Sequence, residues 1–258
     1  MRLSVLGFAV FMLCQNRATA QFSFTADDTL RGSITAERVW WDLRFYDLHV
    51  HLDVEGRQIS GRNVIHYEVL QEGQQQMQID LQPPLVLDSA EQGGKPLVIR
   101  KLGRNAYWLA LEKPQTKGEQ ESITVWYSGV PKEAVRAPWD GGFSWAKDKQ
   151  GKPFVATSCQ GLGASVWWPC KDHPYDEPDS QRISVTVPAP LMDVSNGRLR
   201  SVTRNPDGTR TFEWFVANPI NNYGVNLNVA EYAHFADTFQ GEKGVLDLDF
   251  YVLQENLE

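Results

Sequence analysis

The chain has 258 residues and a formal net charge of −7 at pH 7, with 32 acidic against 25 basic side chains. Nucleic acids and anionic membranes attract clustered lysine and arginine, and this acidic chain has no basic run of five or more residues. The composition therefore excludes both as expected partners, while the length is sufficient for one domain with a sizeable core.

The first 20 residues are typical of an export signal. Arg2 precedes an apolar run at residues 3–14, and Ala18 and Ala20 form an A-x-A cleavage site. The run is too short to span a bilayer, because a spanning helix needs roughly 20 residues. We therefore expect residues 1–20 to be a cleaved signal peptide and the mature chain to be exported, periplasmic or extracellular, with no membrane insertion after cleavage.

Residues 21–37 are polar and are expected to form an extended or poorly ordered N-terminal arm. Strand signals follow. Residues 45–54 alternate, with Leu48 and Val50 on one face and His49 and His51 on the other. The further expected strands are residues 64–70, 77–81, 97–102, 106–112, 122–127, 154–159, 183–188, 198–203, 210–216, 224–229 and 245–253. Two of these flank the turn sequence N-P-D-G at residues 205–208, which indicates a hairpin.

After the signal, no segment of 11 or more residues shows a capped helical period, and Gly, Pro and Asn separate the short runs. This pattern predicts an all-β protein, an antiparallel sandwich or barrel. We expect one β domain over residues 38–253, with residues 254–258 as the start of a linker to a further domain.

The most specific pattern lies between Thr157 and Ser180, reading T-S-C-Q at residues 157–160 and W-P-C-K-D-H-P at 168–174. It resembles the substrate-facing segment in the N-terminal domain of the zinc aminopeptidases of peptidase family M1. The motifs Y-x-L at 46–48, I-x-G at 59–61 and P-x-x-x-Y at 219–223 resemble other strands of that domain. The resemblance implies an antiparallel saddle-like β-sandwich that packs on a thermolysin-like catalytic domain.

Gln160 is the candidate substrate-binding residue. Its amide can accept a hydrogen bond from an ammonium group and donate one to a carbonyl, and Gly161 and Gly163 allow close approach. Taken without any resemblance, the residue is better explained as a surface glutamine in a glycine-rich turn. The resemblance places Gln160 where the family carries a Gln or Glu that binds the amino terminus of a peptide substrate.

Two features depart from the family pattern. Ser165 stands where many relatives carry an arginine, and an acidic segment, residues 176–179, follows Pro174. The side-chain preference of the parent enzyme therefore cannot be transferred to this chain. Asp172 and the acidic side chains of this segment are interpreted as a solvated loop, since no calcium-binding loop spacing accompanies them.

In the family, zinc is bound in the next domain by an H-E-x-x-H helix, and this sequence contains no such motif. We therefore expect no catalytic residue, metal ligand or cofactor in this chain, with zinc in an absent catalytic domain, and no aminopeptidase activity from the chain alone. The expected partners are a peptide substrate and that catalytic domain. The alternative is a stand-alone periplasmic β-sandwich that binds a peptide or a glycan.

Several other side chains raise weaker possibilities. His49 and His51 have a spacing that can share a metal, but a solvated sheet face explains them. His66 with Cys170 faintly resembles a zinc deaminase pattern that lacks its second cysteine. The two cysteines after the signal, 159 and 170, could form a disulfide or remain thiols, and the resemblance favours thiols.

The nine tryptophans include two adjacent pairs, 40–41 and 167–168. Because neighbouring side chains in a strand point to opposite faces, one member of each pair is expected to point inward. Trp139 and Trp145 flank a glycine-containing stretch that is typical of a loop, and we expect both to be exposed.

Overall fold

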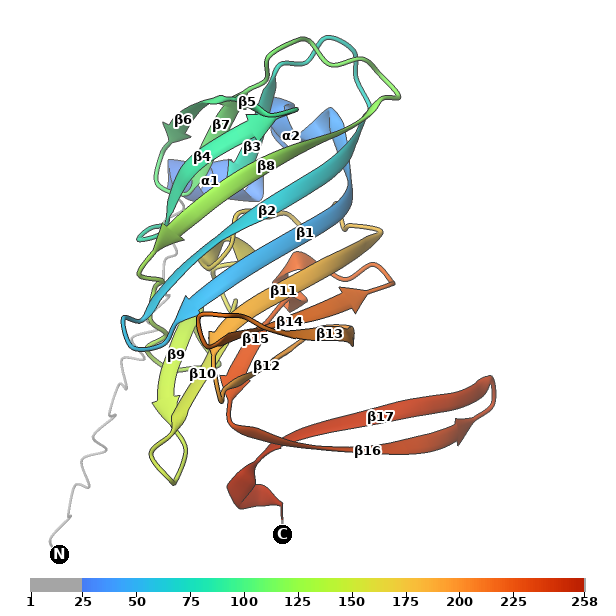
Figure 1. Ribbon diagram of the computed structural model, residues 1–258. Coiled ribbons are helices and arrows are strands. Elements are labelled where there is room, and N and C mark those ends of the chain that lie inside the picture. Colours follow the sequence, from blue (N-terminus) through green and yellow to red (C-terminus); the bar gives the residue numbers. More distant parts are fainter. Residues whose placement is uncertain (1–24, 258) are drawn as a thin grey trace, which may run out of the picture.

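The computed structural model describes residues 25–257. A large twisted sheet dominates the molecule, smaller sheets and two short helices cover one of its faces, and a long hairpin projects from the C-terminal end (Figure 1). The predicted signal peptide lies outside the described residues.

The large sheet has eight strands in the order β13-β14-β11-β1-β2-β8-β4-β5. Its strands are β1 (Trp41–Asp53), β2 (Gln58–Val69), β4 (Val86–Gln92), β5 (Lys95–Pro96), β8 (Gln120–Gly129), β11 (Ser180–Pro188), β13 (Arg198–Arg204) and β14 (Thr209–Val216). β1 runs parallel to β11, whereas β2 and β14 run antiparallel to these two. The predicted all-β, mainly antiparallel class is confirmed.

Three smaller sheets complete the fold. One has the order β12-β15-β10-β9, another the order β3-β7-β6, and β16 and β17 pair only with each other within residues 25–257. The bounds are β3 (Gln76–Asp80), β6 (Val98–Leu102), β7 (Ala106–Ala110), β9 (Gly142–Lys147), β10 (Pro153–Ser158), β12 (Met192–Ser195), β15 (Leu227–Ala230), β16 (Tyr232–Gly241) and β17 (Gly244–Leu253). Every run predicted as a strand overlaps an observed one, and β4, β5, β9, β12 and β16 were not predicted.

The alternation in β1 defines the two faces of the large sheet. Leu48 and Val50 are buried on the inner face, while His49 and His51 lie on the outer face, as predicted. The inner face packs on the segment that carries the W-P-C motif. Tyr46 meets the ring of Trp168 edge-on at 5.0 Å between ring centroids, so the motif lies between the layers of the molecule.

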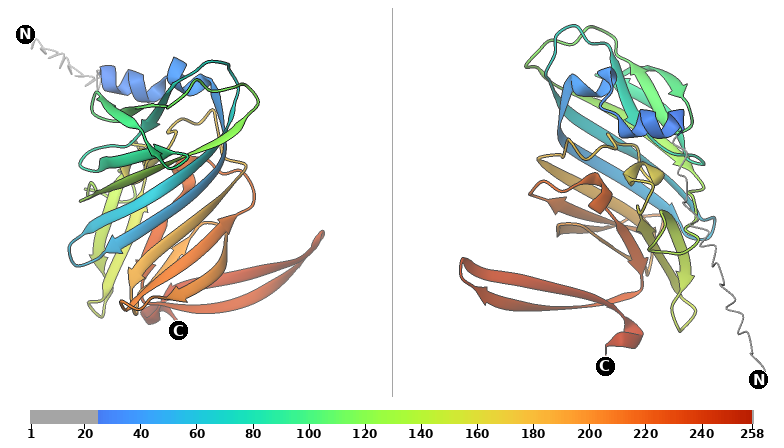
Figure 2. Two further views of the ribbon diagram at one scale, coloured as in Figure 1. Left: turned by 45° about the horizontal axis from the view of Figure 1, so that its top comes forward. Right: turned by 180° about the vertical axis from the view of Figure 1, so that it is seen from behind.

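The expected extended arm is wrong for the described part of residues 21–37, because two helices lie there (Figure 2). They are α1 (Ala26–Gly32) and α2 (Ala36–Val39). A capping box starts α1: Thr25 accepts from the backbone N–H of Asp28, and the Asp28 carboxylate accepts from the N–H of Thr25. None of the helices in residues 25–257 is long and apolar enough to cross a membrane.

Arg38 fastens these helices to the sheets. Its guanidinium donates to the carbonyls of Arg31 (2.7 Å) and Ser33 (2.6 Å) and forms a fully buried ion pair with Asp80 of β3. Three short 3₁₀ turns complete the fold, at Ala164–Val166, Asn222–Gly224 and Gln254–Asn256.

The expectation for the tryptophan pairs is wrong. All four side chains are buried, namely Trp40, Trp41, Trp167 and Trp168. Strict alternation applies only inside a strand; the first pair sits at the junction of α2 and β1, and the second lies in irregular chain after a 3₁₀ turn. Trp139 is 79% exposed, as expected, but Trp145 lies in β9 and stacks on Phe143 at 5.3 Å.

Candidate functional site

Gln160 lies in the tight turn that follows β10. The strand ends at Ser158, Cys159 is buried, and the side chain of Gln160 is exposed. The N–H groups of Leu162 and Gly163 both donate to the carbonyl of Cys159, at 3.0 and 2.9 Å. These two bonds curl the chain so that Gln160 stands at the outside of the turn.

Glycine is required at one position of this turn. Gly163 has a φ of +84°, and a Cβ there would lie 2.4 Å from Oδ2 of Asp172. Gly161 also has a positive φ, +73°, but a Cβ there meets nothing within 4 Å. Gly163 therefore allows the close approach of Asp172, whereas Gly161 serves only the backbone conformation.

Hydrogen bonds from side chains in three separate segments fix the turn. The carboxylate of Asp172 accepts from the N–H (3.1 Å) and the hydroxyl (2.6 Å) of Ser165. The amide of Gln82 donates to the carbonyl of Leu162 (2.6 Å) and to the Ser165 hydroxyl (2.9 Å). Arg31, on α1, donates to the same carbonyl. Ser165, which departs from the family pattern, is thus a buried link that holds the turn carrying Gln160.

Tyr223 orients the amide of Gln160. Its hydroxyl donates to Oε1 of Gln160, and its own N–H is held by Oδ1 of Asn221 at 3.0 Å. Within residues 25–257, Nε2 of Gln160 has no hydrogen-bond partner. The carbonyl oxygen keeps a second lone pair, so the amide can accept one further hydrogen bond and donate two.

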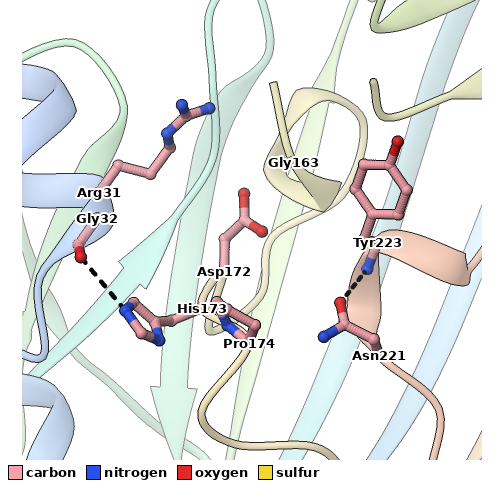
Figure 3. Close-up of a pocket in the computed structure, with 8 residues that line it drawn as sticks. All are labelled: Arg31, Gly32, Gly163, Asp172, His173, Pro174, Asn221 and Tyr223. Atoms are coloured by element: carbon pink, nitrogen blue, oxygen red, sulfur yellow. Dashed lines mark hydrogen bonds between the residues drawn. The ribbon is translucent and has the colours of Figure 1, made fainter. Parts of the chain in front are cut away.

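Two hollows lie beside the Gln160–Tyr223 pair, and Gln160 itself lines one of them. One, of about 440 Å³, is lined by Gln160, Ser158 and the chain from Tyr223 to Asn226. The other, of about 590 Å³, lies between Arg31 and Tyr223, with Asp172 and His173 along its floor (Figure 3). Tyr223 lines both hollows, so the Gln160–Tyr223 pair stands between two spaces that a ligand could occupy.

The cysteines of this segment are free and buried. Burial, reinforced by the charge of Asp172, raises the pKa of Cys159 to about 12. Burial likewise raises the pKa of Cys170 well above its ordinary value. Both therefore remain protonated at neutral pH, a state unsuited to nucleophilic attack or metal binding.

The prediction that the acidic segment is solvated is wrong for Asp176. Its carboxylate is buried, accepts from Nζ of Lys171 at 2.5 Å and from the N–H of Leu43 at 3.2 Å. Lys171 also donates to the carbonyl of Trp41 and lies 3.9 Å from the centroid of that indole ring. Asp176 is thus an anchor of the segment, whereas Glu177 and Asp179 are exposed as expected.

The weaker metal hypotheses gain no support from the geometry. His49 lies on the outer sheet face, 3.0 Å from Asp47. His66 is exposed on that face, whereas Cys170 is fully buried and bridges to Asp80, so the deaminase pairing of His66 with Cys170 is wrong. Among residues 25–257, no group of three or more His, Cys, Asp and Glu side chains lies together as a possible metal site.

The fold and this turn define an all-β domain that exposes one oriented amide at its surface. The sequence matches the family profile described as Peptidase M1 N-terminal domain over residues 44–223. The chain therefore belongs to peptidase family M1, through the N-terminal domain of that family.

Solved structures give the same fold. The M1 zinc metallopeptidase of Deinococcus radiodurans, as a point mutant, is 19% identical, with a TM-score of 0.68 and coverage of 85% of this chain and 49% of that chain. The same mutant bound to a Tyr-Ser-Ala substrate is 19% identical, with a TM-score of 0.70 and coverage of 88% and 53%. This chain thus spans about half the length of these structures. Curated proteins provide no match.

Gln160 was the candidate named from the sequence, and the residues that hold it were not named. Tyr223 was visible as the last residue of the P-x-x-x-Y motif, and its site role became apparent only when the fold placed it beside Gln160. Gln82 and Arg31 come from distant parts of the chain and carried no sequence signal. Asp172 had been interpreted as part of a solvated loop.

Proposed function

We propose that this chain is the substrate-facing N-terminal domain of an exported zinc aminopeptidase, and that Gln160 binds the free amino group of the peptide. The parent reaction is the release of N-terminal amino acids from peptides. The observation that carries the proposal is the exposed Gln160 amide, oriented by Tyr223 between two hollows.

In the proposed contact, the oxygen and the nitrogen of the Gln160 amide bind two neighbouring groups at the start of a peptide. The ammonium group donates to Oε1 of Gln160, and Nε2 donates to the first peptide carbonyl. Because the turn is already fixed by Asp172, Gln82 and Arg31, little side-chain and loop entropy remains to be lost on binding. Such a fixed contact restricts the parent enzyme to the first residue of a peptide.

The zinc site of the proposed enzyme lies outside residues 25–257. The described residues offer no ligand set for zinc, so no step that depends on the metal is assigned to them. The role that we propose for this chain is to bind and position the substrate, and the sequence carries no H-E-x-x-H motif to add chemistry.

The hairpin β16–β17 supports a catalytic partner domain over the stand-alone alternative. One face carries paired apolar side chains, with Phe235 stacked on Phe250 at 4.9 Å and Phe239 opposite Leu246. Phe239 is 59% exposed, and the hairpin projects from the domain (Figure 2). A contiguous exposed apolar face marks an interaction surface. We propose that a further domain of the enzyme covers it.

Two further observations support the proposal. Residues 1–20 have the features of a signal peptide, which supports export. A structure of similar fold binds the peptide Tyr-Ser-Ala, which supports a peptide as the ligand of this chain.

The test is calorimetric titration of the 258-residue protein with Tyr-Ser-Ala and with its N-acetylated form. We expect the free peptide to bind about ten-fold or more tightly than the acetylated one, because a hydrogen bond to a charged group contributes roughly 1.5–3 kcal/mol. Gln160→Ala should remove this preference. The matched control is Gln150→Ala, at an exposed glutamine in the β9–β10 turn, which should preserve it. Equal binding of both peptides to the native protein would refute the proposal.

A further inference from the structure

A third hollow lies on the outer face of the large sheet, the face turned toward the viewer in Figure 1. Its volume is about 430 Å³, and side chains from β1, β2, β4, β8 and β11 line it. The chemistry-bearing residues are His49, His51, Arg62, Asp88, Trp126 and Thr186; we call it the outer hollow. It is separated from Gln160 by the sheet, because the segment carrying Gln160 packs on the inner face.

The strand register brings the key side chains together. His49 on β1 is opposite Arg62 on β2, and Arg62 is opposite Trp126 on β8. Directly opposed residues of neighbouring antiparallel strands have Cβ atoms about 4.5–5.5 Å apart. An imidazole, a guanidinium and an indole therefore stand in one row. Arg62 is exposed and Trp126 is half-buried, so both face the hollow.

No carboxylate of residues 25–257 forms an ion pair with Arg62, and Asp47 pairs instead with His49 and Arg182. The contact of Arg62 is with Nε2 of His49, at 3.3 Å. That nitrogen also lies 3.0 Å from Oδ1 of Asp47, and one imidazole nitrogen either donates or accepts. A nitrogen that donates to Asp47 cannot accept from Arg62 at the same time, so the Asp47–His49 bond and the Arg62–His49 bond exclude each other.

The ionised state of Asp47 decides between the two bonds. Partial burial raises the pKa of Asp47, but the hydrogen bond from His49 and the charges of Arg182 and Arg62 lower it more. The ionised Asp47 therefore takes the N–H of His49, which leaves the guanidinium of Arg62 free to bind an anion in the hollow.

The backbone around the outer hollow excludes an added peptide strand. β1, β2 and β8 are each paired on both sides, so their N–H and C=O groups are already used in the sheet. Extended peptides bind sheets at an open edge, through main-chain hydrogen bonds. A ligand of the outer hollow must instead be recognised by side chains alone.

We propose that the outer hollow binds a saccharide that carries a carboxylate, such as a uronic acid unit. The flat indole of Trp126 packs against the C–H face of the sugar ring. The guanidinium of Arg62 binds the carboxylate through two parallel N–H···O bonds, the geometry for which arginine is suited. His51, Asp88 and Thr186 supply donors and acceptors for the hydroxyl groups around the ring.

Titration calorimetry with the 258-residue protein tests this proposal, using trigalacturonate and the neutral galactotriose as probes. We expect trigalacturonate to bind at least about ten-fold more tightly, the ratio that a charge-assisted bidentate contact supplies. In the Arg62→Gln variant, the affinities for the two sugars should become equal and weak. Trp126→Ala should abolish binding of both, and Trp126→Tyr, which keeps an aromatic surface in case the alanine variant is unstable, should retain part of it.

Matched surface variants serve as controls. Trp139 and Arg57 are exposed side chains that do not line the outer hollow, so Trp139→Ala and Arg57→Gln should leave both affinities unchanged. Absence of saturable binding, equal affinity for both sugars, or equal losses in Arg62→Gln and Arg57→Gln would overturn the proposal. A tetraglutamate peptide that binds as tightly as trigalacturonate would overturn the saccharide assignment.

Discussion

The turn that carries Gln160 and the hairpin β16–β17 are both at the surface, yet they are held in opposite ways. The turn is held by side chains from the loop between β3 and β4, from α1 and from the chain that follows the turn, namely Gln82, Arg31 and Asp172. The hairpin is joined to the rest by fewer contacts: Tyr251, near its base, contacts Trp214, and Asp247, nearer its tip, forms an exposed ion pair with Arg198.

This difference matches the roles that we propose for the two regions. A residue that selects a small ligand gains from being fixed before the ligand arrives. A surface that another domain covers needs apolar area rather than internal support. The comparison predicts that variants in the supports of the turn are costly, whereas variants on the apolar face of the hairpin are not.

The largest effect is expected for Arg38→Met. The change leaves Asp80 with no counter-charge in a fully buried position, and breaking one partner of a buried pair costs about 3–5 kcal/mol. Urea unfolding measures the loss. The control is Arg57→Met, at an exposed pair with Glu133 (3.6 Å), with an expected cost below about 1 kcal/mol. Similar losses in both variants would contradict the central role of the buried pair.

Gly163→Ala should have the next largest effect. The new methyl group would lie 2.4 Å from the Asp172 carboxylate, at a φ of +84°, so both strain and loss of the hydrogen bonds to Ser165 are expected, about 2–3 kcal/mol together. Gly161→Ala, at a φ of +73° with open space around it, should cost only about 1–2 kcal/mol. The two unfolding curves test this order, and a reversed order would show that Asp172 does not restrain the turn.

A smaller, pH-dependent effect is expected for Lys171. Burial lowers its pKa to about 8 in the folded protein, against the attraction of Asp176, whereas the unfolded chain keeps a pKa of about 10.4. Between these values the unfolded state binds more protons, so this residue makes stability rise with pH from 8 to about 10.4 and has no such effect below pH 8. The stability difference between the native protein and Lys171→Met should grow over that window, and a constant difference would disprove the assignment.

The smallest effect on stability is expected for Phe239→Ser, on the apolar face of the hairpin. Because Phe239 is already 59% exposed, the free energy of unfolding should change by less than about 0.5 kcal/mol. Binding of a hydrophobic dye to the native protein should nevertheless fall. Thr238→Ser, on the opposite face of the same strand, should change neither quantity. A large loss of stability in Phe239→Ser would show that the hairpin face is part of the core.

The strands were predictable where alternation is regular, and missed where it fails. Within β1, residues 45–53 alternate regularly, and the strand predicted over residues 45–54 agrees with the fold there. The start of β1, residues 41–44, was not predicted, and a register shift follows it between Leu43 and Phe45. β4 carries a register shift between Leu87 and Ser89, which breaks the period. α1 was missed because it is only seven residues long, although its capping box was present in the sequence.

Of the residues around the candidate site, the sequence singled out Gln160 alone, and its role there stays a prediction. Gln160 stands in a recognisable motif, but its supports act through contacts between distant segments, such as Gln82 with Leu162. Asp176 looked like a loop residue because its partner, Lys171, is itself a charged residue that rarely becomes buried. Burial of that pair depends on the irregular path of the chain after Cys170, which no periodicity encodes.

The most direct test of the account is an NMR titration that follows the side-chain amide of Gln160 in the 258-residue protein. Addition of Tyr-Ser-Ala should shift the Nε2 proton resonances of Gln160, because the free amino terminus and first carbonyl bind that amide, while the N-acetylated peptide at the same concentration should leave them in place. Unchanged resonances with the free peptide, or equal shifts with both peptides, would contradict the assignment of Gln160 as the amino-terminus binding residue.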